Sequence, residues 1–210
     1  MARRQLLTDE ERRLLLGVPH DVDALTRYYT FTRFDRDLVA NRCGAANRLG
    51  FAVQLALLRH PGIALAQIEE PVDALVNWLA ERLEIPAAAF TKYASRPQTM
   101  TDHERILAAA LELHPPSAAD LPFMIEAAAQ AAWSTDRGHA IAAGVIAALR
   151  SKKIILPAPA VIERAAIAGR ARARQRCADA LLAGVSTKHL PNSTNCLPSI
   201  RRSERRHLRG

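Results

Sequence analysis

The stretch ANRLGFAVQLALLR at residues 46–59 decides the fold. Gly44 precedes it and His60-Pro61-Gly62 follows it, so residues that break helices bound it on both sides. Between these limits, apolar residues occupy almost every position instead of one stripe. A helix that is apolar nearly all round is usually buried. The stretch therefore predicts a buried helix within a helical protein.

Helix start signals recur along the rest of the chain. A Ser or Thr followed by an acid three residues later, the spacing of a capping box, begins at Thr8, Thr32, Thr99 and Ser117. The sequence predicts helices over 9–16, 22–29, 32–42, 46–59, 72–83, 99–113, 117–133, 136–150 and 160–183, a turn at 87–93 and a short extended stretch at 154–156. No alternating apolar pattern with hairpin turns appears. The predicted fold class is all-α, a protein of multi-helix bundles with Trp78 and Trp133 in the core.

Three regions are expected. Residues 1–85 form a helical unit in which residues 33–42, Gly44 and residues 46–59 have the outline of a helix–turn–helix. Residues 86–190 form a second helical bundle that ends in a basic helix. Residues 191–210 form a disordered basic tail, because they lack amphipathic periodicity and contain few apolar residues.

The basic character is concentrated late in the chain. The 210 residues carry a formal charge of +8. Residues 1–149 are slightly acidic, whereas residues 150–176 hold a single acid, Glu163, among many lysines and arginines. A concentrated basic stretch indicates a polyanion partner, most often nucleic acid, or else a solvated helix face.

Several classes of protein are excluded. Three cysteines in 210 residues do not make a disulfide scaffold, and no apolar run is long enough to span a membrane. Histidines and cysteines form no metal-binding motif, and no glycine-rich phosphate loop is present. We therefore expect a cytoplasmic protein that is not an enzyme, with no catalytic residues, metal or cofactor and no membrane partner.

Three ordered blocks are more specific than composition. Residues 41–62 read NRCGAANRLGFAVQLALLRHPG, residues 90–103 read FTKYASRPQTMTDH, and residues 134–157 read STDRGHAIAAGVIAALRSKKIILP. Together with QLLTDEERRLLLGVP near the N-terminus, they resemble the N-terminal region of the Tn-three family of replicative transposases. The chain departs from that pattern at Met100, where the family has an arginine after the threonine.

The resemblance implies a function. In that family the N-terminal region recognises the terminal inverted repeats of the transposon, and strand cutting takes place in an RNase-H-like domain far downstream. The chain therefore resembles a truncated transposase that retains DNA recognition and lacks the catalytic core. The implied partners are duplex DNA and, in addition, full-length transposase or a second copy of the chain. Residues 191–210 do not resemble the family.

Candidate DNA contacts come first from the predicted helix–turn–helix. Asn47 and Gln54 are seven residues apart and share a helix face, and both amides suit bidentate contact with adenine. Arg48 suits guanine or phosphate, and Arg59 suits phosphate. The alternatives are that Asn47 caps the helix and that the helix is buried.

Further candidates lie in the other two blocks. Lys92, Arg96 and Thr99 surround a helix start, where backbone N–H groups bind phosphate, although Thr99 alone could serve as a cap. Basic residues of the C-terminal third complete the set: Arg150, Lys152, Lys153, Arg170, Arg172 and Arg174. Arg170 and Arg174 repel each other at i,i+4 unless phosphates or acids lie opposite.

Two functions remain open at this stage. The first is a DNA-binding module for transposon ends, active in DNA transposition and recombination. The second is a folded transposase remnant with only nonspecific DNA binding or self-association. A preference for the inverted repeat over other DNA separates them.

Overall fold

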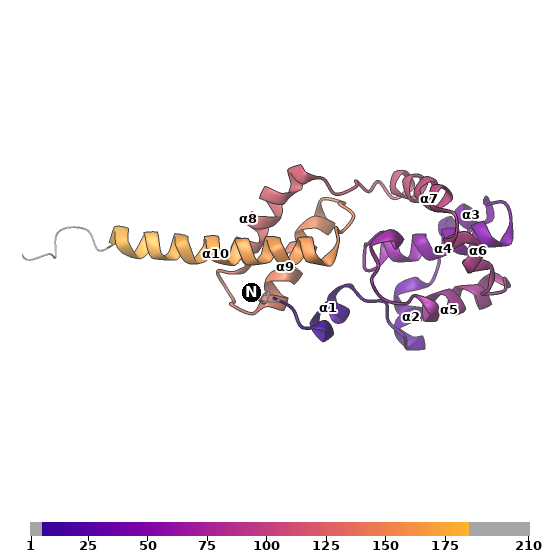
Figure 1. Ribbon diagram of the computed structural model, residues 1–210, viewed down its shortest axis with the longest axis horizontal. Helices are drawn as coiled ribbons and strands as arrows, with labels where there is room; N and C mark the ends of the chain where they lie inside the picture. Colours follow the sequence, from indigo (N-terminus) through magenta and orange to yellow (C-terminus); the bar gives the residue numbers. More distant parts are fainter. Residues whose placement is uncertain (1–5, 185–210) are drawn as a thin grey trace, which may run out of the picture. The chain divides into compact units, whose positions relative to one another are not determined.

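The computed structural model describes residues 6–184, and every regular element within this range is a helix (Figure 1). This confirms the all-α prediction. The elements, in chain order, are α1 Asp9–Leu16, α2 Val22–Tyr29, α3 Arg33–Ala40, α4 Ala45–Arg59, η1 Leu65–Gln67, α5 Asp73–Leu83, α6 Ala89–Ala94, α7 Pro97–Ala110, η2 Ala118–Asp120, α8 Leu121–Ala131, α9 Gly138–Ser151 and α10 Pro159–Gly184.

Three of the four predicted capping boxes form as expected. At α1 the Thr8 hydroxyl accepts a hydrogen bond from the Glu11 N–H, and the Glu11 carboxylate accepts one from the Thr8 N–H at 2.8 Å. Thr32 begins α3 in the same way, and Ser117 begins η2. The prediction for Thr99 is wrong, because α7 already begins at Pro97 and Thr99 lies inside its first turn. Pro97 suits this position because it has no N–H to leave unpaired.

Helix α4 is the centre of the first of two hydrophobic clusters. All of its residues from Leu49 to Leu58 are buried. Helices α2, α3, α5, α6 and α7 each pack against it (Figure 1). The predicted buried helix is therefore confirmed. Its burial also means that most of the predicted recognition helix faces protein instead of solvent.

Gly50 permits the closest of these contacts. A Cβ atom built on Gly50 would lie 2.1 Å from two ring atoms of Tyr93, a residue of α6. Only a glycine lets the α6 ring lie directly on the α4 backbone. Glycine here serves close approach, since no unusual backbone angle is recorded at this position.

The second cluster joins the beginning of the chain to its last third. Leu7 and Leu16, which flank and end α1, are buried together with residues of α8, α9 and α10. Helix α8 packs against α9, and α1 also packs against α9. Gly169 of α10 lies against α8, because a Cβ there would be 2.3 Å from the Ala128 side chain.

Residues 154–156 lie between the two clusters. Ile155 belongs to the first cluster, and Ile154 and Leu156 belong to the second. The stretch is extended, as predicted: the Leu156 N–H donates to Gly62 O at 2.8 Å and the Ile155 N–H donates to His114 O at 2.9 Å. Alternate side chains of an extended segment point in opposite directions, so one short stretch serves both clusters.

The expected boundary near residue 86 stays a prediction. Contacts divide the chain into a unit of residues 1–174 and a unit of residues 175–210, and α10 contributes to both. The first cluster contains residues from both sides of position 86. The predicted disordered tail, residues 191–210, lies outside the described residues.

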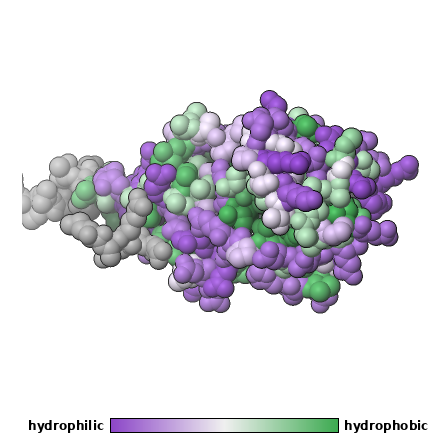
Figure 2. All heavy atoms as spheres, turned by 45° about the vertical axis from the view of Figure 1, so that its right-hand side comes forward, coloured by the Kyte–Doolittle hydropathy of each residue, from purple (hydrophilic) through white to green (hydrophobic). Residues whose placement is uncertain are grey.

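The surface is mostly polar, but several large hydrophobic side chains are exposed, Trp133 among them. On the face drawn in Figure 2, hydrophilic side chains predominate and hydrophobic ones show between them. Trp133 is 56% exposed, so its predicted place in the core is wrong, whereas Trp78 is buried as predicted. Helix α8 ends at Ala131, two residues before Trp133, and the apolar stripe of the helix therefore does not reach it. No helix among residues 6–184 combines the length and the hydropathy needed to cross a membrane.

The Gly50 contact gives a stability prediction. We expect Gly50→Ala to lower the free energy of unfolding by about 1–3 kcal/mol, because the new methyl group overlaps the Tyr93 ring in a packed core. Urea denaturation measures the change. In a Tyr93→Ala background the same substitution should cost much less, as a double-mutant cycle detects. An equal cost in both backgrounds would contradict the clash.

Candidate nucleic-acid interface

A buried hydrogen-bond network crosses from α4 to α6 and α7. Gln54 Nε2 donates to the Tyr93 hydroxyl at 2.8 Å and to Met100 O at 3.0 Å. The Tyr93 hydroxyl lies 3.0 Å from His103 Nδ1, and the Tyr93 and His103 rings stack. Burial raises the pKa of Tyr93 and lowers the pKa of His103, because removal from water disfavours the charged form of each.

This network argues against base reading by Gln54. Its side chain is only 2% exposed, and its amide N–H groups are used inside the protein. A buried amide without its partners is costly, so the core holds it in place. Asn47 is half-buried and donates to Cys43 O at 3.0 Å, which also limits its predicted contact with adenine. Helix α4 begins at Ala45, so Asn47 is not its cap.

Arg59 has a structural partner at the other end of α4. Its Nη2 lies 2.6 Å from Oδ1 of Asp35, a residue that is 0% exposed. The second Asp35 oxygen accepts hydrogen bonds from the Thr32 N–H and hydroxyl, each at 2.8 Å. Arg59 therefore compensates the buried charge of the carboxylate that caps α3. It keeps other N–H donors for a second acceptor.

The three basic residues at the C-terminal end of α9 differ in their contacts. Arg150 donates to Pro61 O from Nε at 3.2 Å and from Nη2 at 2.6 Å. The Lys152 ammonium lies over the Phe123 ring, 3.8 Å from its centroid. Lys153 forms an ion pair with Glu112, which lowers the pKa of that carboxyl group. The structure thus places two adjacent lysines in different surroundings.

Acidic side chains lie opposite the predicted arginines of α10. Arg174 forms two hydrogen bonds of 2.9 Å with the carboxylate of Asp136. Arg172 lies 3.4 Å from Glu126 of α8. Arg170 is half-buried. Because acids already lie opposite Arg172 and Arg174, the charge of this helix is partly compensated within the protein.

Several of the predicted DNA contacts lie together at the N-terminus of α4. A surface pocket of about 540 Å³, which we call the α4–α6 pocket, is lined by Cys43–Asn47, Pro86, Ala88, Ala89, Lys92 and Arg96. None of the described residues that line it is acidic. Lys92 and Arg96 are both exposed. Sequence blocks some fifty residues apart therefore supply one basic pocket, and the exposed Arg48 directly follows the last pocket residue of α4.

The N-terminus of α4 is open toward this pocket. Gly44 precedes the helix with a φ of 84°, and no side chain caps the first turn. A Cβ built on Gly44 would meet nothing within 4 Å. The first N–H groups of a helix lack partners within it and attract anions. Gly44 was not among the predicted DNA contacts, although a glycine directly before a helix was a signal that could have indicated it.

Another group lies at the C-terminus of α4. A pocket of about 400 Å³, the α4–α9 pocket, is lined by Leu58, Arg59, Gly62, Leu111, Leu113, Arg150 and Lys153–Ile155. It brings together three of the predicted phosphate contacts. Thr99, Lys152, Arg170, Arg172 and Arg174 line neither basic pocket.

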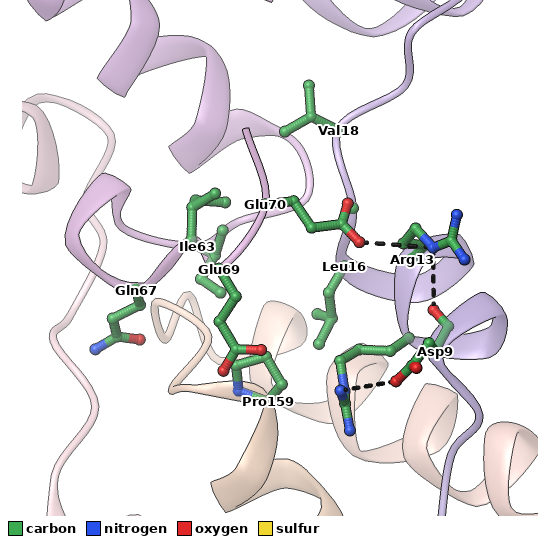
Figure 3. A pocket seen from close by; sticks show the side chains of 12 residues that line it. Asp9, Arg13, Leu16, Val18, Ile63, Gln67, Glu69, Glu70 and Pro159 are labelled. Atoms are coloured by element: carbon green, nitrogen blue, oxygen red, sulfur yellow. Dashed lines mark hydrogen bonds and ion pairs between the residues drawn. The ribbon is translucent and has the colours of Figure 1, made fainter. Parts of the chain in front are cut away.

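The pocket beside α1 has a different character (Figure 3). Glu70 reaches toward Arg13 at 3.7 Å, and Arg12 lies 3.4 Å from Asp9. Arg12 also binds Glu163 of α10 at 2.7 Å. Acidic side chains along its wall disfavour a nucleic-acid backbone there. Among residues 6–184, no cluster of histidine, cysteine or carboxylate side chains could hold a metal ion.

Comparison with known proteins identifies the family. Residues 6–169 match a family described as "Domain of unknown function (DUF4158)". The chain belongs to the DUF4158 family. This DUF4158 chain is also 40% identical over 189 residues to the transposase for transposon Tn501 from Pseudomonas aeruginosa, and 35% identical over 189 residues to the transposase for transposon Tn21 from Escherichia coli. The transposase for transposon Tn1546 from Enterococcus faecium is 28% identical over 203 residues.

The match covers most of this chain and a small part of the relatives. The two alignments to the Tn501 and Tn21 transposases span 90% of the DUF4158 chain and 19% of each transposase. The matched part is the N-terminal region of these Tn-three family proteins, as the three sequence blocks predicted. The chain thus spans about a fifth of the length of the curated relatives it matches.

The buried network separates a structural from a DNA-reading role for Gln54. We expect Gln54→Leu to lower the free energy of unfolding by about 1–3 kcal/mol, because the Tyr93 hydroxyl and Met100 O lose their donor. The affinity of the folded protein for DNA should not change. Urea denaturation and a DNA titration of the same preparation measure the two effects. A loss of affinity at unchanged stability would restore the base-reading role.

Proposed function

We propose that this chain is a DNA-binding module that recognises the terminal inverted repeats of a transposon. Its relatives are transposases for transposons, and the alignments to the Tn501 and Tn21 transposases span 90% of the chain. Recognition of transposon ends requires duplex DNA as the partner. The proposal assigns no catalytic step to this chain.

The observation that carries the proposal is the α4–α6 pocket. Two exposed cations, Lys92 and Arg96, line it together with the open N-terminus of a fifteen-residue helix, and no acid lines it among the described residues. A phosphate between these groups would receive charge-assisted hydrogen bonds from the side chains and backbone N–H donors from α4. Most protein–DNA hydrogen bonds are of this positioning kind.

Exposed residues beside the pocket could read bases. Arg48 lies in the first turn of α4, directly after the pocket residue Asn47, and is exposed, which suits contact with guanine in the major groove. Deeper residues of α4 are buried and do not reach a groove. We therefore assign recognition to the end of α4 and its surroundings instead of to the whole helix.

A binding titration tests the function. A labelled duplex of the terminal inverted repeat and a scrambled duplex of the same length are compared at two salt concentrations. We expect at least a tenfold preference for the repeat, which corresponds to about 1.4 kcal/mol. Equal affinities that disappear together at moderate salt would contradict specific recognition, because counterion release alone produces that behaviour.

Substitutions in the α4–α6 pocket test its part in binding. We expect Lys92→Gln and Arg96→Gln each to weaken binding to both duplexes and to reduce the slope of log affinity against log salt by about 0.9, the value for one lost phosphate contact. Arg164→Gln is the matched control. It removes the same charge from an exposed site on α10 that lies outside this pocket. If all three variants lose affinity equally, overall charge and not the pocket controls binding.

A further inference from the structure

The α4–α9 pocket collects cations from three separate parts of the chain. Arg59 comes from the last turn of α4, Arg150 from α9, and Lys153 from the turn before the extended stretch. The remaining lining residues are apolar or glycine, and none of the described lining residues is acidic. Three cations around one pocket repel one another unless an anion enters or nearby acceptors hold them.

Two of these cations are held in place by acceptors inside the protein. Asp35, the partner of Arg59, is fully buried and does not line the pocket. Arg150 is fixed by two hydrogen bonds to one carbonyl oxygen, which carries no formal charge. Each guanidinium keeps unused N–H donors in a fixed orientation. Burial also lowers the pKa of Arg150, so an anion nearby would relieve the cost of its charge.

Lys153 is the exchangeable member of the group. Its partner Glu112 is 76% exposed, and the lysine side chain is 53% exposed. Ion pairs on the surface contribute little to stability, so a phosphate can replace the carboxylate at small cost. The backbone beside Lys153 is fixed, because Lys153 O accepts a hydrogen bond from the His114 N–H at 2.8 Å.

We infer that Arg59, Arg150 and Lys153 bind a backbone phosphate of the DNA, at a second point separate from the α4–α6 pocket. This inference rests on the proposed function. The two pockets adjoin the first and the last turn of α4, which has fifteen residues. At a rise of about 1.5 Å per residue, the helix separates the two contacts by about 20 Å. The major groove of B-DNA is about 12 Å wide, so the two phosphates lie farther apart than one groove width.

Adjacent lysines provide a matched test. Lys153→Gln should weaken binding to the inverted-repeat duplex roughly fivefold at moderate salt and reduce the salt slope by about 0.9. Lys152→Gln removes the same charge one residue away, but Lys152 lies over Phe123 and does not line the pocket, so it should change affinity little. Glu112→Gln should have the opposite effect and strengthen binding, because Lys153 loses the carboxylate that competes with phosphate.

Phosphate-ethylation interference locates the contact on the DNA. With the unmodified protein we expect two groups of phosphates whose ethylation blocks binding. Lys153→Gln should abolish interference at one group, and Lys92→Gln at the other. Loss of the same group in both variants would overturn the assignment of a second contact.

The outcomes separate this inference from the proposed function. If the unmodified chain does not bind DNA, the proposed function fails. If it binds and Lys153→Gln behaves like Lys152→Gln, only the second contact fails. Inorganic phosphate is a further probe: if it raises the melting temperature of the unmodified protein but not of the Lys153→Gln variant, while DNA affinity is the same for both, the pocket binds free phosphate and not the DNA backbone.

Discussion

The structure depends on the burial of α4 on all sides. Ten consecutive residues, Leu49 to Leu58, are removed from water, so helices must cover the whole circumference of α4. One of those ten is Gln54, whose amide must then find partners within the protein. Tyr93 and Met100 O accept hydrogen bonds from its N–H groups, which joins α6 and α7 to α4. The hydrogen bonds of one buried amide thus help to fix the positions of α6 and α7 on α4.

Residues from two of the three sequence blocks act mainly through this packing. Gly50 leaves room for the Tyr93 ring, Gln54 donates to the Tyr93 hydroxyl, and that hydroxyl contacts His103. The first two residues belong to one sequence block and the last two to another. All four residues lie at one interface between helices, and Lys92 and Arg96 are exposed next to it. These residues therefore hold α6 and α7 against α4, and the two basic pockets lie at the two ends of α4.

Electrostatics divides the basic residues into two groups. Arg172 and Arg174 have acidic side chains opposite them, and Lys152 rests on an aromatic ring. By contrast, Lys92 and Arg96 line a pocket free of acids among the described residues. Arg59 and Lys153 do have acidic partners, Asp35 and Glu112, but together with Arg150 they line a pocket whose described lining residues include no acid. Charge density along the sequence favoured residues 150–176 as the DNA-binding region. The three-dimensional arrangement of the charges instead favours the two ends of α4 as the DNA-binding region, because basic side chains from distant segments come together there.

The sequence by itself determined most of the helices and the burial of α4, because caps, helix breakers and apolar periodicity act over a few residues. The three sequence blocks indicated the family by resemblance, whereas α6, at residues predicted as a turn, was missed. Boundaries shifted where a proline could begin a helix earlier, as at Pro97. The tertiary structure alone decided that Trp133 is exposed, that Gln54 is paired inside, and that Lys153 lines a pocket that Lys152 does not. Each of these depends on which distant residues become neighbours, and local sequence patterns carry no information about that.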